Sequence, residues 1–439
     1  MLYEIRDPIH TTITFNDKEK KVIDHPFVQK LRFIRQLGLK SLVYPGAVHN
    51  RFEHCLGAMH MAGRLFDAID GKSDVFKKFG PENKKYFREL LRLAGLLHDV
   101  GHGPFSHASE HLLPNLGQLD IPKSWYTKYN PRNRASHEDY SVLLTKTLGS
   151  EKENIFGADE ARDVASFIHK KVTPSASWDK RFKNKKEAAA YHQFMRSLIS
   201  GEIDVDRMDY LLRDAYFTGV PYGNYDLEWL LHVVGAIETK DGPQLVIKLG
   251  GIRAFEDFLL ARYHMVLQVY FHRTTAVFEM CIEKAFQTGE LDVKISADPY
   301  EYADVRDSTV YESLFRAAKD ENNFWSRQVV NRLPLKSVYQ AELGRPEHRA
   351  RYQAIVRELK KAGLEYFEIT AQRTMSEQGL KPGSLRILVA EKFLDRVEYT
   401  PIEKRSELLK KYNNQINRIY VYCRRDDYKK VVKILSVVK

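Results

Sequence analysis

A cluster of histidines early in the chain limits the possible folds more than any other feature of the sequence. Seven of the 16 histidines lie between residues 49 and 111 of the 439. An apolar segment at helical spacing, residues 90–97, ends directly at His98-Asp99, and Gly101 and Gly103 follow it. Because a helix that stops at this point can direct both side chains at one ion, the cluster predicts a helical site for a metal or for acid–base chemistry.

Two further segments carry the residue types that such a site would need. Residues 50–54 end in His54, and residues 201–210 contain three aspartates. A third imidazole and a distant carboxylate would complete four nitrogen and oxygen ligands, a set that suits iron, manganese, zinc or nickel-like ions and leaves positions for water and substrate. The alternative is that the histidines are ordinary core or helix-surface residues, which we expect of six of the 16. These are His60, His111, His169, His192, His232 and His348.

The composition excludes several other classes of protein. Hydrophobic residues make up 43% and charged residues 29%, as in ordinary soluble chains, and the mean hydropathy is −0.45. No apolar run of the length needed to cross a bilayer occurs, and the N-terminus lacks the pattern of a signal peptide. The three cysteines are far apart and fit neither a disulfide framework nor a paired zinc motif. We therefore expect a cytoplasmic protein without membrane contact.

The net charge allows two interpretations. The 69 lysines and arginines exceed the 58 acidic residues, which gives a net charge of +11 and a pI near 9.2. Such an excess is found on solvated surfaces, and it also suits a polyanionic partner such as nucleotide phosphates or nucleic acid. Residues 174–186 carry five of the basic side chains. We expect this segment to be a solvated loop, with nucleic-acid contact as the alternative.

The chain divides into two regions. Residues 1–290 are predicted to be mostly helical, with exposed loops at about 118–133 and 174–186. Residues 291–439 mix helical patterns with predicted strands at 385–389, 396–399 and 419–422, and residues 426–439 favour a short helix. The expected fold class is mostly α, with a helical core at 1–290 and a smaller C-terminal mixed α/β lobe at 291–439.

At these motifs the sequence resembles the HD-domain phosphohydrolase superfamily. It is most similar to the deoxynucleoside triphosphate triphosphohydrolases of the group that contains the vertebrate SAM-and-HD-domain enzyme and its bacterial homologues. The matching segments are residues 7–10, 36–38, 44–47, 49–54, 98–107, 203–210 and 418–423. The resemblance covers nearly the whole chain, although residues 290–415 match weakly. It implies a helical HD-domain core and a C-terminal lobe that serves oligomerisation or regulation.

The resemblance implies one set of residues for each function. The metal ligands are His54, His98, Asp99 and Asp206. The catalytic histidine is His102, with His137 and Glu110 as its supporting partners. The substrate-binding residues are Gln36, Leu37, Arg51, His107, Arg207, Tyr210, Asp214, Arg262, Tyr270 and Arg273. The sequence departs from the vertebrate pattern where Glu110 replaces Asp, where Arg207 and Arg273 replace Lys, and where Val266 replaces His.

The implied reaction is hydrolysis of a deoxynucleoside triphosphate at the α-phosphate, which yields a deoxynucleoside and inorganic triphosphate. Four arginines, at 51, 207, 262 and 273, would neutralise the triphosphate together with Mg²⁺ through charge-assisted bonds. His102, held by Glu110, would protonate the departing 5′-oxygen. Leu37 and Tyr270 packed against the sugar would exclude a 2′-hydroxyl group.

The resemblance also implies a separate activator site for GTP or dGTP, which drives assembly of an active tetramer in the vertebrate enzyme. Asp24, Gln29 and Arg32 match its guanine-recognising residues. A carboxylate can accept from guanine N1 and N2, and an arginine can donate to O6 and N7. The alternative is a solvated amphipathic helix with Asp24 as its N-cap and Pro26 in its first turn. A homo-oligomer follows from the resemblance alone.

Two other functions compete with this hypothesis. One is a different HD-domain phosphohydrolase, a nucleotidase or a phosphodiesterase that acts on a signalling nucleotide or a nucleic-acid end. A monophosphate would need fewer cations than the four arginines provide. The other is a nucleic-acid-binding or regulatory module with a vestigial site, which the complete set of histidine and aspartate residues argues against.

Overall fold

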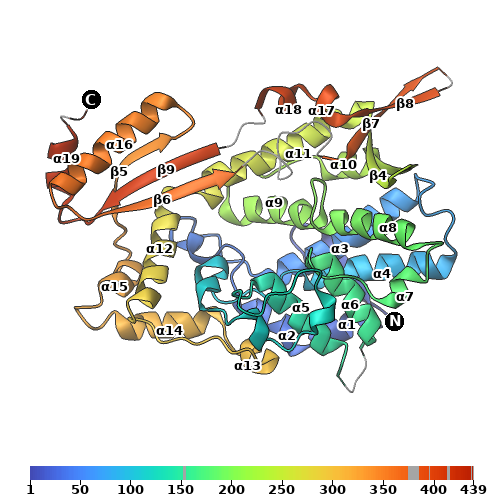
Figure 1. The fold of residues 1–439 in the computed structure, drawn as a ribbon, viewed down its shortest axis with the longest axis horizontal. Coiled ribbons are helices and arrows are strands. Elements are labelled where there is room, and N and C mark those ends of the chain that lie inside the picture. Colours follow the sequence, from blue (N-terminus) through green and yellow to red (C-terminus); the bar gives the residue numbers. More distant parts are fainter. Residues whose placement is uncertain (152–154, 374–384, 395, 413–415, 437, 439) are drawn as a thin grey trace.

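Helices α3 (Arg51–Asp70), α4 (Pro81–Leu97) and α9 (Val205–Thr218) form the centre of a helical core (Figure 1). The computed structural model describes residues 1–151, 155–373, 385–394, 396–412, 416–436 and 438. α3 packs along both α4 and α9. The close approach of α3 and α4 needs Gly95, where a Cβ atom would lie 2.8 Å from the carbonyl oxygen of Ala58. The predicted helical core is confirmed.

Further helices surround this centre. Those described within residues 1–290 are α1 (Asp17–Asp24), α2 (Pro26–Gln29), α5 (His137–Leu148), α6 (Ala158–Ile168), α7 (Ala176–Asp179), α8 (Lys185–Ile199), α10 (Leu227–Val233), α11 (Ile252–Met265) and α12 (Arg273–Gln287). α11 continues into a π-helical turn at Val266–Tyr270 before α12 begins. Since π turns occur frequently at functional sites, this turn marks a place to look for ligand contacts.

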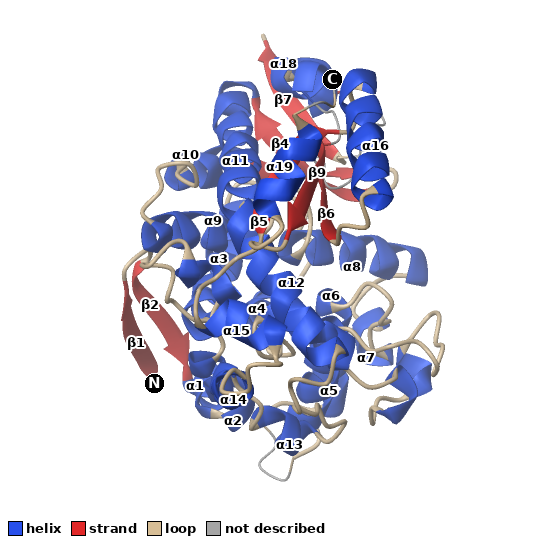
Figure 2. Ribbon diagram, turned by 90° about the vertical axis from the view of Figure 1, so that its left-hand side faces the viewer, coloured by secondary structure: helices blue, strands red, loops and turns tan. Residues whose placement is uncertain are grey.

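Two β-hairpins also lie within residues 1–290, which the expectation of a mostly helical region did not include. β1 (Leu2–Asp7) pairs antiparallel with β2 (Thr11–Asn16), and β3 (Val234–Thr239) pairs antiparallel with β4 (Gly242–Lys248). Figure 2 shows the first hairpin at one edge of the molecule, apart from the other strands. The second hairpin turns at Lys240-Asp241, and Gly242, which follows with φ of 105°, completes the dipeptide Asp241-Gly242. This dipeptide is a strong hairpin signal that the helical interpretation of the segment passed over.

One sheet joins the two predicted regions. β4 pairs in parallel with β7 (Ile387–Phe393), and β7 pairs antiparallel with β8 (Arg396–Pro401). The strand order is β3-β4-β7-β8, so that two strands come from each side of residue 290. The strands expected at 385–389 and 396–399 correspond to β7 and β8. The division at residue 290 stays a prediction, and this sheet is the place where the two parts are continuous.

The second large sheet has the order β5-β9-β6 and contains the strand predicted at 419–422. Its strands are β5 (Lys336–Glu342), β6 (Tyr366–Arg373) and β9 (Ile416–Cys423). Side chains alternate along β9: Val421 and Cys423 pack with α16 (Pro346–Lys361) and α19 (Tyr428–Leu435), whereas Tyr420 and Tyr422 pack in the cluster that contains α12 residues. α16 and α19 therefore cover the outer face of this sheet (Figure 1), and α19 is the predicted C-terminal helix.

Short helices complete the C-terminal part. They are α13 (Pro299–Ala303), α14 (Asp307–Ala317), α15 (Phe324–Val330), α17 (Ile402–Arg405) and α18 (Glu407–Tyr412). The described helices include none with the length and apolar character needed to span a bilayer.

The two segments predicted as exposed loops are only partly exposed. Trp125 is buried within residues 118–133, and Trp178 on α7 is fully buried within residues 174–186. The lysines at 183, 185 and 186 are exposed, as expected of a solvated basic loop. Since a large aromatic side chain gains much stability from burial, each tryptophan anchors its segment to the core.

Candidate metal centre and active site

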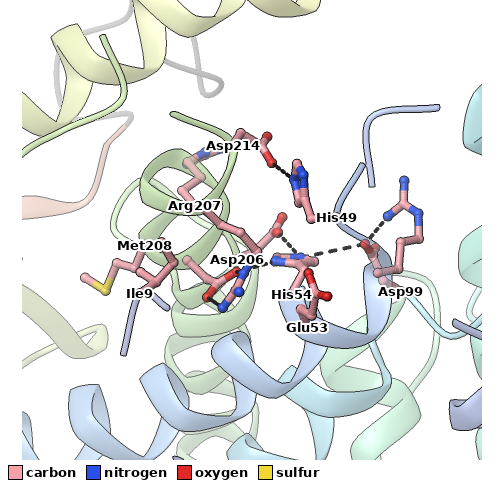
Figure 3. A network of polar contacts seen from close by, with 12 residues as sticks. Ile9, His49, Glu53, His54, Asp99, Asp206, Arg207, Met208 and Asp214 are labelled. Carbon is pink, nitrogen blue, oxygen red and sulfur yellow. Dashed lines mark hydrogen bonds and ion pairs between the residues drawn. The ribbon is translucent and has the colours of Figure 1, made fainter. Parts of the chain in front are cut away.

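The side chains of His54, His98, Asp99 and Asp206 converge between helices α3, α4 and α9. Figure 3 shows His54 between Asp99 and Asp206. The Nε2 atom of His54 lies 3.2 Å from Nε2 of His98 and 3.1 Å from a carboxylate oxygen of Asp206. The Nε2 atom of His98 lies 3.4 Å from an oxygen of Asp99 and 3.4 Å from an oxygen of Asp206. Two imidazoles and two carboxylates thus direct ligand atoms into one space, a donor set that suits a divalent transition metal.

The ends of three helices position these side chains. Asn50 caps the N-terminus of α3 by accepting a backbone hydrogen bond, and His54 follows in the first turn. His98-Asp99 comes directly after the last residue of α4. Asp204 caps α9 in the same manner as Asn50 caps α3, and Asp206 lies in the first turn of α9. Local capping chemistry therefore fixes where each ligand leaves its helix.

Hydrogen bonds on the far side of both imidazoles define which nitrogen faces the centre. Nδ1 of His54 lies 2.8 Å from a carboxylate oxygen of Asp209, and Nδ1 of His98 lies 2.8 Å from the carbonyl oxygen of Gly95. Each Nδ1 therefore carries a proton and donates it, which leaves Nε2 as the ligand atom in the neutral ring. Such outer hydrogen bonds are typical of histidine ligands in metal sites.

Asp209 is itself held by a buried network. One of its oxygens lies 2.7 Å from Nε2 of His10, and Arg213 donates to both of its oxygens at 2.8 Å. Arg213 also donates to Asp7, at 2.9 Å. Residues 7–10, to which the resemblance assigned no role, thus hold Asp209, which in turn contacts the candidate ligand His54. Asp209 could have been found from the sequence, because it lies three residues after Asp206 and so on the same helical face.

The charges in the cluster require a positive charge at its centre. Although burial opposes it, hydrogen bonds to Asp206 and Asp209 raise the pKa of His54 to about 10. Burial would raise the pKa of Asp206, but hydrogen bonds with His54 and His98 outweigh it and hold that pKa below its usual range. Protons on the imidazoles meet this requirement without a metal. A divalent cation would replace them, and the four residues present therefore fit a metal ion.

Arg51 links the metal centre to the glycine-rich segment that follows α4. Its guanidinium donates to Asp99 and to Oγ of Ser106, the latter at 2.7 Å. Burial alone would raise the pKa of Asp99, but His98 and Arg51 hold it well below its usual range. Phe105 and Ser106 both have left-handed backbone conformations, with φ of 52° and 57°. Such conformations are uncommon for residues other than glycine, and here they turn the Ser106 hydroxyl toward Arg51.

His102 and His137 stack on one another beside the metal centre. Their ring centroids are 3.9 Å apart at an angle of 15°, and Nε2 of His102 lies 3.4 Å from an oxygen of Asp99. Nδ1 of His137 is hydrogen-bonded to Glu110. Burial, followed by the positive charge of Arg51 and the neighbouring His137, holds the pKa of His102 well below its usual value. His102, Glu110 and His137 form a second group whose ligand atoms could hold a metal ion.

The close approach of α5 explains this stacking. Ser141 on α5 donates to the carbonyl oxygen of His98 at 2.8 Å and accepts from the backbone N–H of Gly101 at 2.9 Å. A Cβ atom at Gly101 would lie 2.1 Å from the carbonyl oxygen of His137. Glycine is therefore needed at position 101 for α5 to pack against this segment, in addition to any part in ending α4.

A cavity of about 500 Å³ opens beside this centre. Eleven of the predicted site residues line it: Gln36, Leu37, Arg51, Asp99, His102, His137, Asp206, Tyr210, Asp214, Arg262 and Tyr270. His54, His98 and Glu110 contact residues of this wall from behind. Val266, from the π-helical turn, also lines the cavity. Most residues that the resemblance assigned to catalysis and substrate binding are thus brought together in one space.

A polar network joins the residues expected near the sugar. Asp214 lies 2.8 Å from Nε2 of His49 and accepts from the hydroxyl of Tyr270 at 2.7 Å (Figure 3 shows the first contact). The ring of His49 also stacks on Phe217, with centroids 4.5 Å apart. These buried contacts fix the carboxylate of Asp214 at the cavity wall.

Three predicted substrate residues are not described at the cavity. Arg207 donates to the carbonyl oxygen of Gly201 and lies 3.3 Å from Asp204. Arg273 is exposed at the start of α12 and is not among the described lining residues. The side chain of His107 lies outside the described part of the structure. Their predicted contacts with substrate stay predictions.

Several lining residues carried no predicted role. They are Lys40, Phe105, Ser106, Phe271, Ala276, Glu279, Ile369, Thr370, Ala371 and Tyr420. The last four come from β6 and β9, so that the C-terminal sheet forms part of the cavity wall. The alternation of residues 419–422 indicated a strand with two faces, but the sequence contains no signal for the surface that each face covers.

The residues of the predicted activator site lie together on α1, α2 and the turn that follows. Arg32 donates to Gln29 at 2.8 Å, and its guanidinium lies 3.6 Å from the ring centroid of Phe52. Asp24 is the last residue of α1 and pairs with Lys20. Asp24 is not the N-cap of the next helix, as the alternative interpretation held. His25 caps α2 through its ring, and Pro26 occupies the first turn as expected.

Comparison with known proteins identifies two families along the chain. Residues 51–214 match the HD domain, and residues 230–438 match the HD-associated region. The Bacillus subtilis uncharacterized protein YwfO is 38% identical over 282 residues, 64% of this chain and 54% of that protein. A Dictyostelium discoideum homolog of the deoxynucleoside triphosphate triphosphohydrolase SAMHD1 is 29% identical over 341 residues, 76% of this chain and 59% of that protein. The chain thus spans less than two thirds of the length of these relatives.

Three longer alignments extend over nearly the whole chain. The deoxynucleoside triphosphate triphosphohydrolase SAMHD1 of Gallus gallus is 26% identical over 441 residues, 97% of this chain and 67% of that protein. The crystal structure of a hypothetical protein from Aquifex aeolicus superposes with a TM-score of 0.74 at 25% identity and covers 99% of this chain and 100% of that one. A phosphohydrolase from Bacteroides thetaiotaomicron, with a TM-score of 0.68 at 22% identity over 97% and 100% of the two chains, shares the fold.

Proposed function

Because the chain belongs to the HD-domain phosphohydrolases, we propose that it hydrolyses deoxynucleoside triphosphates at the α-phosphate and releases deoxynucleoside and inorganic triphosphate. One observation carries this proposal. The cavity of about 500 Å³ is lined at once by two of the metal-centre carboxylates, the stacked histidines, two buried arginines and apolar side chains. A nucleotide needs all four kinds of contact, and cavities of this size are typical of small-molecule sites.

His54, His98, Asp99 and Asp206 would hold a divalent metal, and a further Mg²⁺ would accompany the triphosphate. When bound, such ions polarise a phosphoryl group and lower the pKa of water. The two carboxylates of the centre line the cavity, which supports a position of the α-phosphate directly beside it.

Among the residues that the structure describes, Arg51 and Arg262 are the arginines that line the cavity. Charge-assisted, bidentate bonds from guanidinium groups are suited to phosphate oxygens. Arg207 would have to leave Gly201 and Asp204 to join them. The proposal therefore relies on two arginines directly, rather than on the four that the sequence suggested.

His102 is the residue we propose as the acid for the departing 5′-oxygen. In the reaction, water forms a bond to the α-phosphorus, the bond from phosphorus to the 5′-oxygen breaks, and that oxygen takes up a proton. The pKa of His102 is held low by burial, Arg51 and His137. Triphosphate oxygens beside Arg51 would offset its charge and raise the pKa of His102, so that protonation follows substrate binding. His137, tied to Glu110, would keep the ring of His102 in place.

Product analysis tests the reaction. Purified protein would be incubated with each dNTP and Mg²⁺ or Mn²⁺, and the products would be separated by chromatography and identified by mass spectrometry. Deoxynucleoside with intact triphosphate is expected. His102→Ala should lower turnover by about 10²–10⁴-fold while the metal at His54, His98, Asp99 and Asp206 stays bound. Deoxynucleoside monophosphate with pyrophosphate would contradict the proposed cleavage point.

The second candidate is another phosphohydrolase reaction on the same centre. Its support is that Arg207 and Arg273 are not described at the cavity, which leaves fewer arginines there than the four that the sequence suggested. Deoxynucleoside monophosphates, cyclic nucleotides and oligonucleotides would be assayed beside the dNTPs. Turnover of one of these classes with none of dNTPs would favour this candidate.

We also propose that GTP or dGTP activates the enzyme through Asp24, Gln29 and Arg32, and that the active form is a homo-oligomer. The hydrogen bond between Arg32 and Gln29 and the stacking of Arg32 on Phe52 support this, because Phe52 adjoins Arg51 on α3. Turnover and light scattering would be measured with and without GTP. Arg32→Ala should abolish the response to GTP, and an unchanged response would rule this site out.

A further inference from the structure

Lys40 and Glu279 form an ion pair in the wall of the same cavity. The ammonium nitrogen of Lys40 lies 2.9 Å from Oε1 of Glu279. Lys40 belongs to the short 3₁₀ helix Gly38–Leu42 and is buried, and Glu279 lies on α12 and is half-buried. Both line the cavity, and neither belongs to the metal centre, the stacked histidines or the residues assigned to phosphate and sugar.

Their surroundings suit a planar heterocycle rather than a phosphate. Leu37, Phe271, Ala276, Ala371 and Tyr420 line the cavity together with the pair. Apolar and aromatic walls with a few placed polar groups are typical of sites that enclose a flat ligand. The phosphates would be held by Arg51, Arg262 and the metal centre, which leaves the base as the part of a nucleotide that can meet this wall.

We propose that Lys40 and Glu279 read the hydrogen-bonding edge of the nucleobase, and that the pair favours guanine. This inference rests on the proposed function, since it deepens the choice of substrate at the same site. An ammonium group can only donate, and an ionised carboxylate can only accept. Oε2 of Glu279 makes no hydrogen bond within the part of the chain that the structure describes, so it is available to a ligand.

Guanine matches this arrangement best. Its O6 acceptor adjoins two donors, N1–H and the N2 amino group, so that Lys40 can donate to O6 while the two oxygens of Glu279 accept from N1 and N2. Adenine presents one donor and one acceptor on this edge, and cytosine and thymine each present one donor and two acceptors. Since each of these bases has a single donating position, only one oxygen of Glu279 can accept from it, and one hydrogen bond is lost. A hydrogen bond to a charged group that is lost on exchange of the base changes selectivity by about tenfold.

The first test is the ratio of kcat/KM among the four dNTPs. The wild type should prefer dGTP by about tenfold, and Glu279→Gln and Lys40→Met should each remove that preference. Two control variants on α12, the helix that carries Glu279, make the same chemical changes at residues that do not line the cavity. They are Glu283→Gln, at an exposed residue hydrogen-bonded to Gln287, and Lys284→Met. Equal kcat/KM values for all four dNTPs in the wild type, or a dGTP preference that survives Glu279→Gln, would overturn the inference.

The second test does not depend on hydrolysis. Calorimetric titration of the Mn²⁺-loaded enzyme with the four deoxynucleosides measures base recognition alone. Tighter binding of deoxyguanosine, lost in Glu279→Gln and kept in Glu283→Gln, supports the inference even if no dNTP is hydrolysed. Equal affinities for the four deoxynucleosides overturn it even if all dNTPs are hydrolysed, in which case the proposed function stands without it.

Discussion

The carboxylate of Asp307 accepts a hydrogen bond of 2.9 Å from the backbone N–H of Phe105, a residue 202 positions earlier in the chain. Its other oxygen accepts from the backbone N–H of Arg35, also at 2.9 Å. Asp307 is buried and is the first residue of α14, in the C-terminal part of the chain. One carboxylate thus ties together two segments whose next residues, Gln36 and Ser106, line the cavity. The HD-associated region therefore takes part in shaping the site directly.

Asp307→Ala is expected to destabilise the protein and to impair the site. The change leaves the buried N–H of Phe105 and the partly buried N–H of Arg35 without acceptors, at about 1–3 kcal/mol for a buried group, and releases the left-handed conformation of Phe105. The free energy of unfolding in urea should fall by about 2–4 kcal/mol, and kcat/KM should fall by at least about tenfold through misplacement of Ser106 and Arg51.

Asp307→Asn provides the graded comparison, because its amide keeps one acceptor and should lose about half as much stability. Asp304→Asn, at an exposed neighbour, is the matched control and should change the unfolding free energy by less than about 0.5 kcal/mol. Equal stability of Asp307→Ala and the wild type would show that the two hydrogen bonds do not hold the segments together.

Asp209→Asn is expected to weaken metal binding although it leaves all four proposed ligands in place. The carboxylate accepts from Nδ1 of His54 at 2.8 Å and thereby directs Nε2 to the centre. Loss of such an outer partner lowers metal affinity by about 10–100-fold. Competition with a chelator, followed by elemental analysis, measures the affinity. The control is Asp241→Asn, in the exposed turn between β3 and β4, which should bind metal with wild-type affinity. Wild-type metal affinity in Asp209→Asn would contradict the orienting role of Asp209.

Gly57→Ala tests the contact between α3 and α9 that holds Asp209. A Cβ atom at position 57 would lie 1.7 Å from a carboxylate oxygen of Asp209 and 2.6 Å from the guanidinium of Arg213. Overpacking of a buried contact lowers the free energy of unfolding by about 1–3 kcal/mol or more. The variant should therefore unfold at a lower urea concentration and bind metal more weakly. Gly157→Ala has no atom within 4 Å of the new Cβ and should keep wild-type metal affinity. Wild-type metal binding in Gly57→Ala would contradict the tight packing around Asp209.

The helical core and the groups around the metal centre could be predicted because their signals are local. A capped helix start at Asn50, an apolar helix that ends at His98-Asp99 and an aspartate-rich helix start each lie within a few residues. The contacts between Asp307 and Arg35, and between Lys40 and Glu279, span 272 and 239 residues. No local pattern encodes such pairs, because they exist only once segments far apart in the sequence have packed against one another.

Arg207 illustrates that a motif match does not determine the direction of a side chain. It adjoins Asp206 in the sequence, but successive residues of a helix point about 100° apart. The side chain of Arg207 accordingly turns to Gly201 and Asp204, while Asp206 faces the centre. The β1–β2 hairpin was missed for a different reason: its strands have six residues each, and a short segment of mixed polarity gives a weak periodic signal.

His192 is expected to make the stability depend on pH between about 6.5 and 4. Its Nε2 lies 2.8 Å from the hydroxyl of Ser166, and burial, with Arg196, lowers its pKa from 6.5 to about 4. Within that window the unfolded chain binds a proton that the folded protein does not, so stability falls as the pH falls, by about 2 kcal/mol between pH 7.5 and 5. Since other buried histidines also titrate, the informative quantity is the difference in unfolding free energy between the wild type and His192→Gln at each pH. That difference should shift by about 2 kcal/mol over this range. A difference that stays constant with pH would show that burial does not lower the pKa of His192.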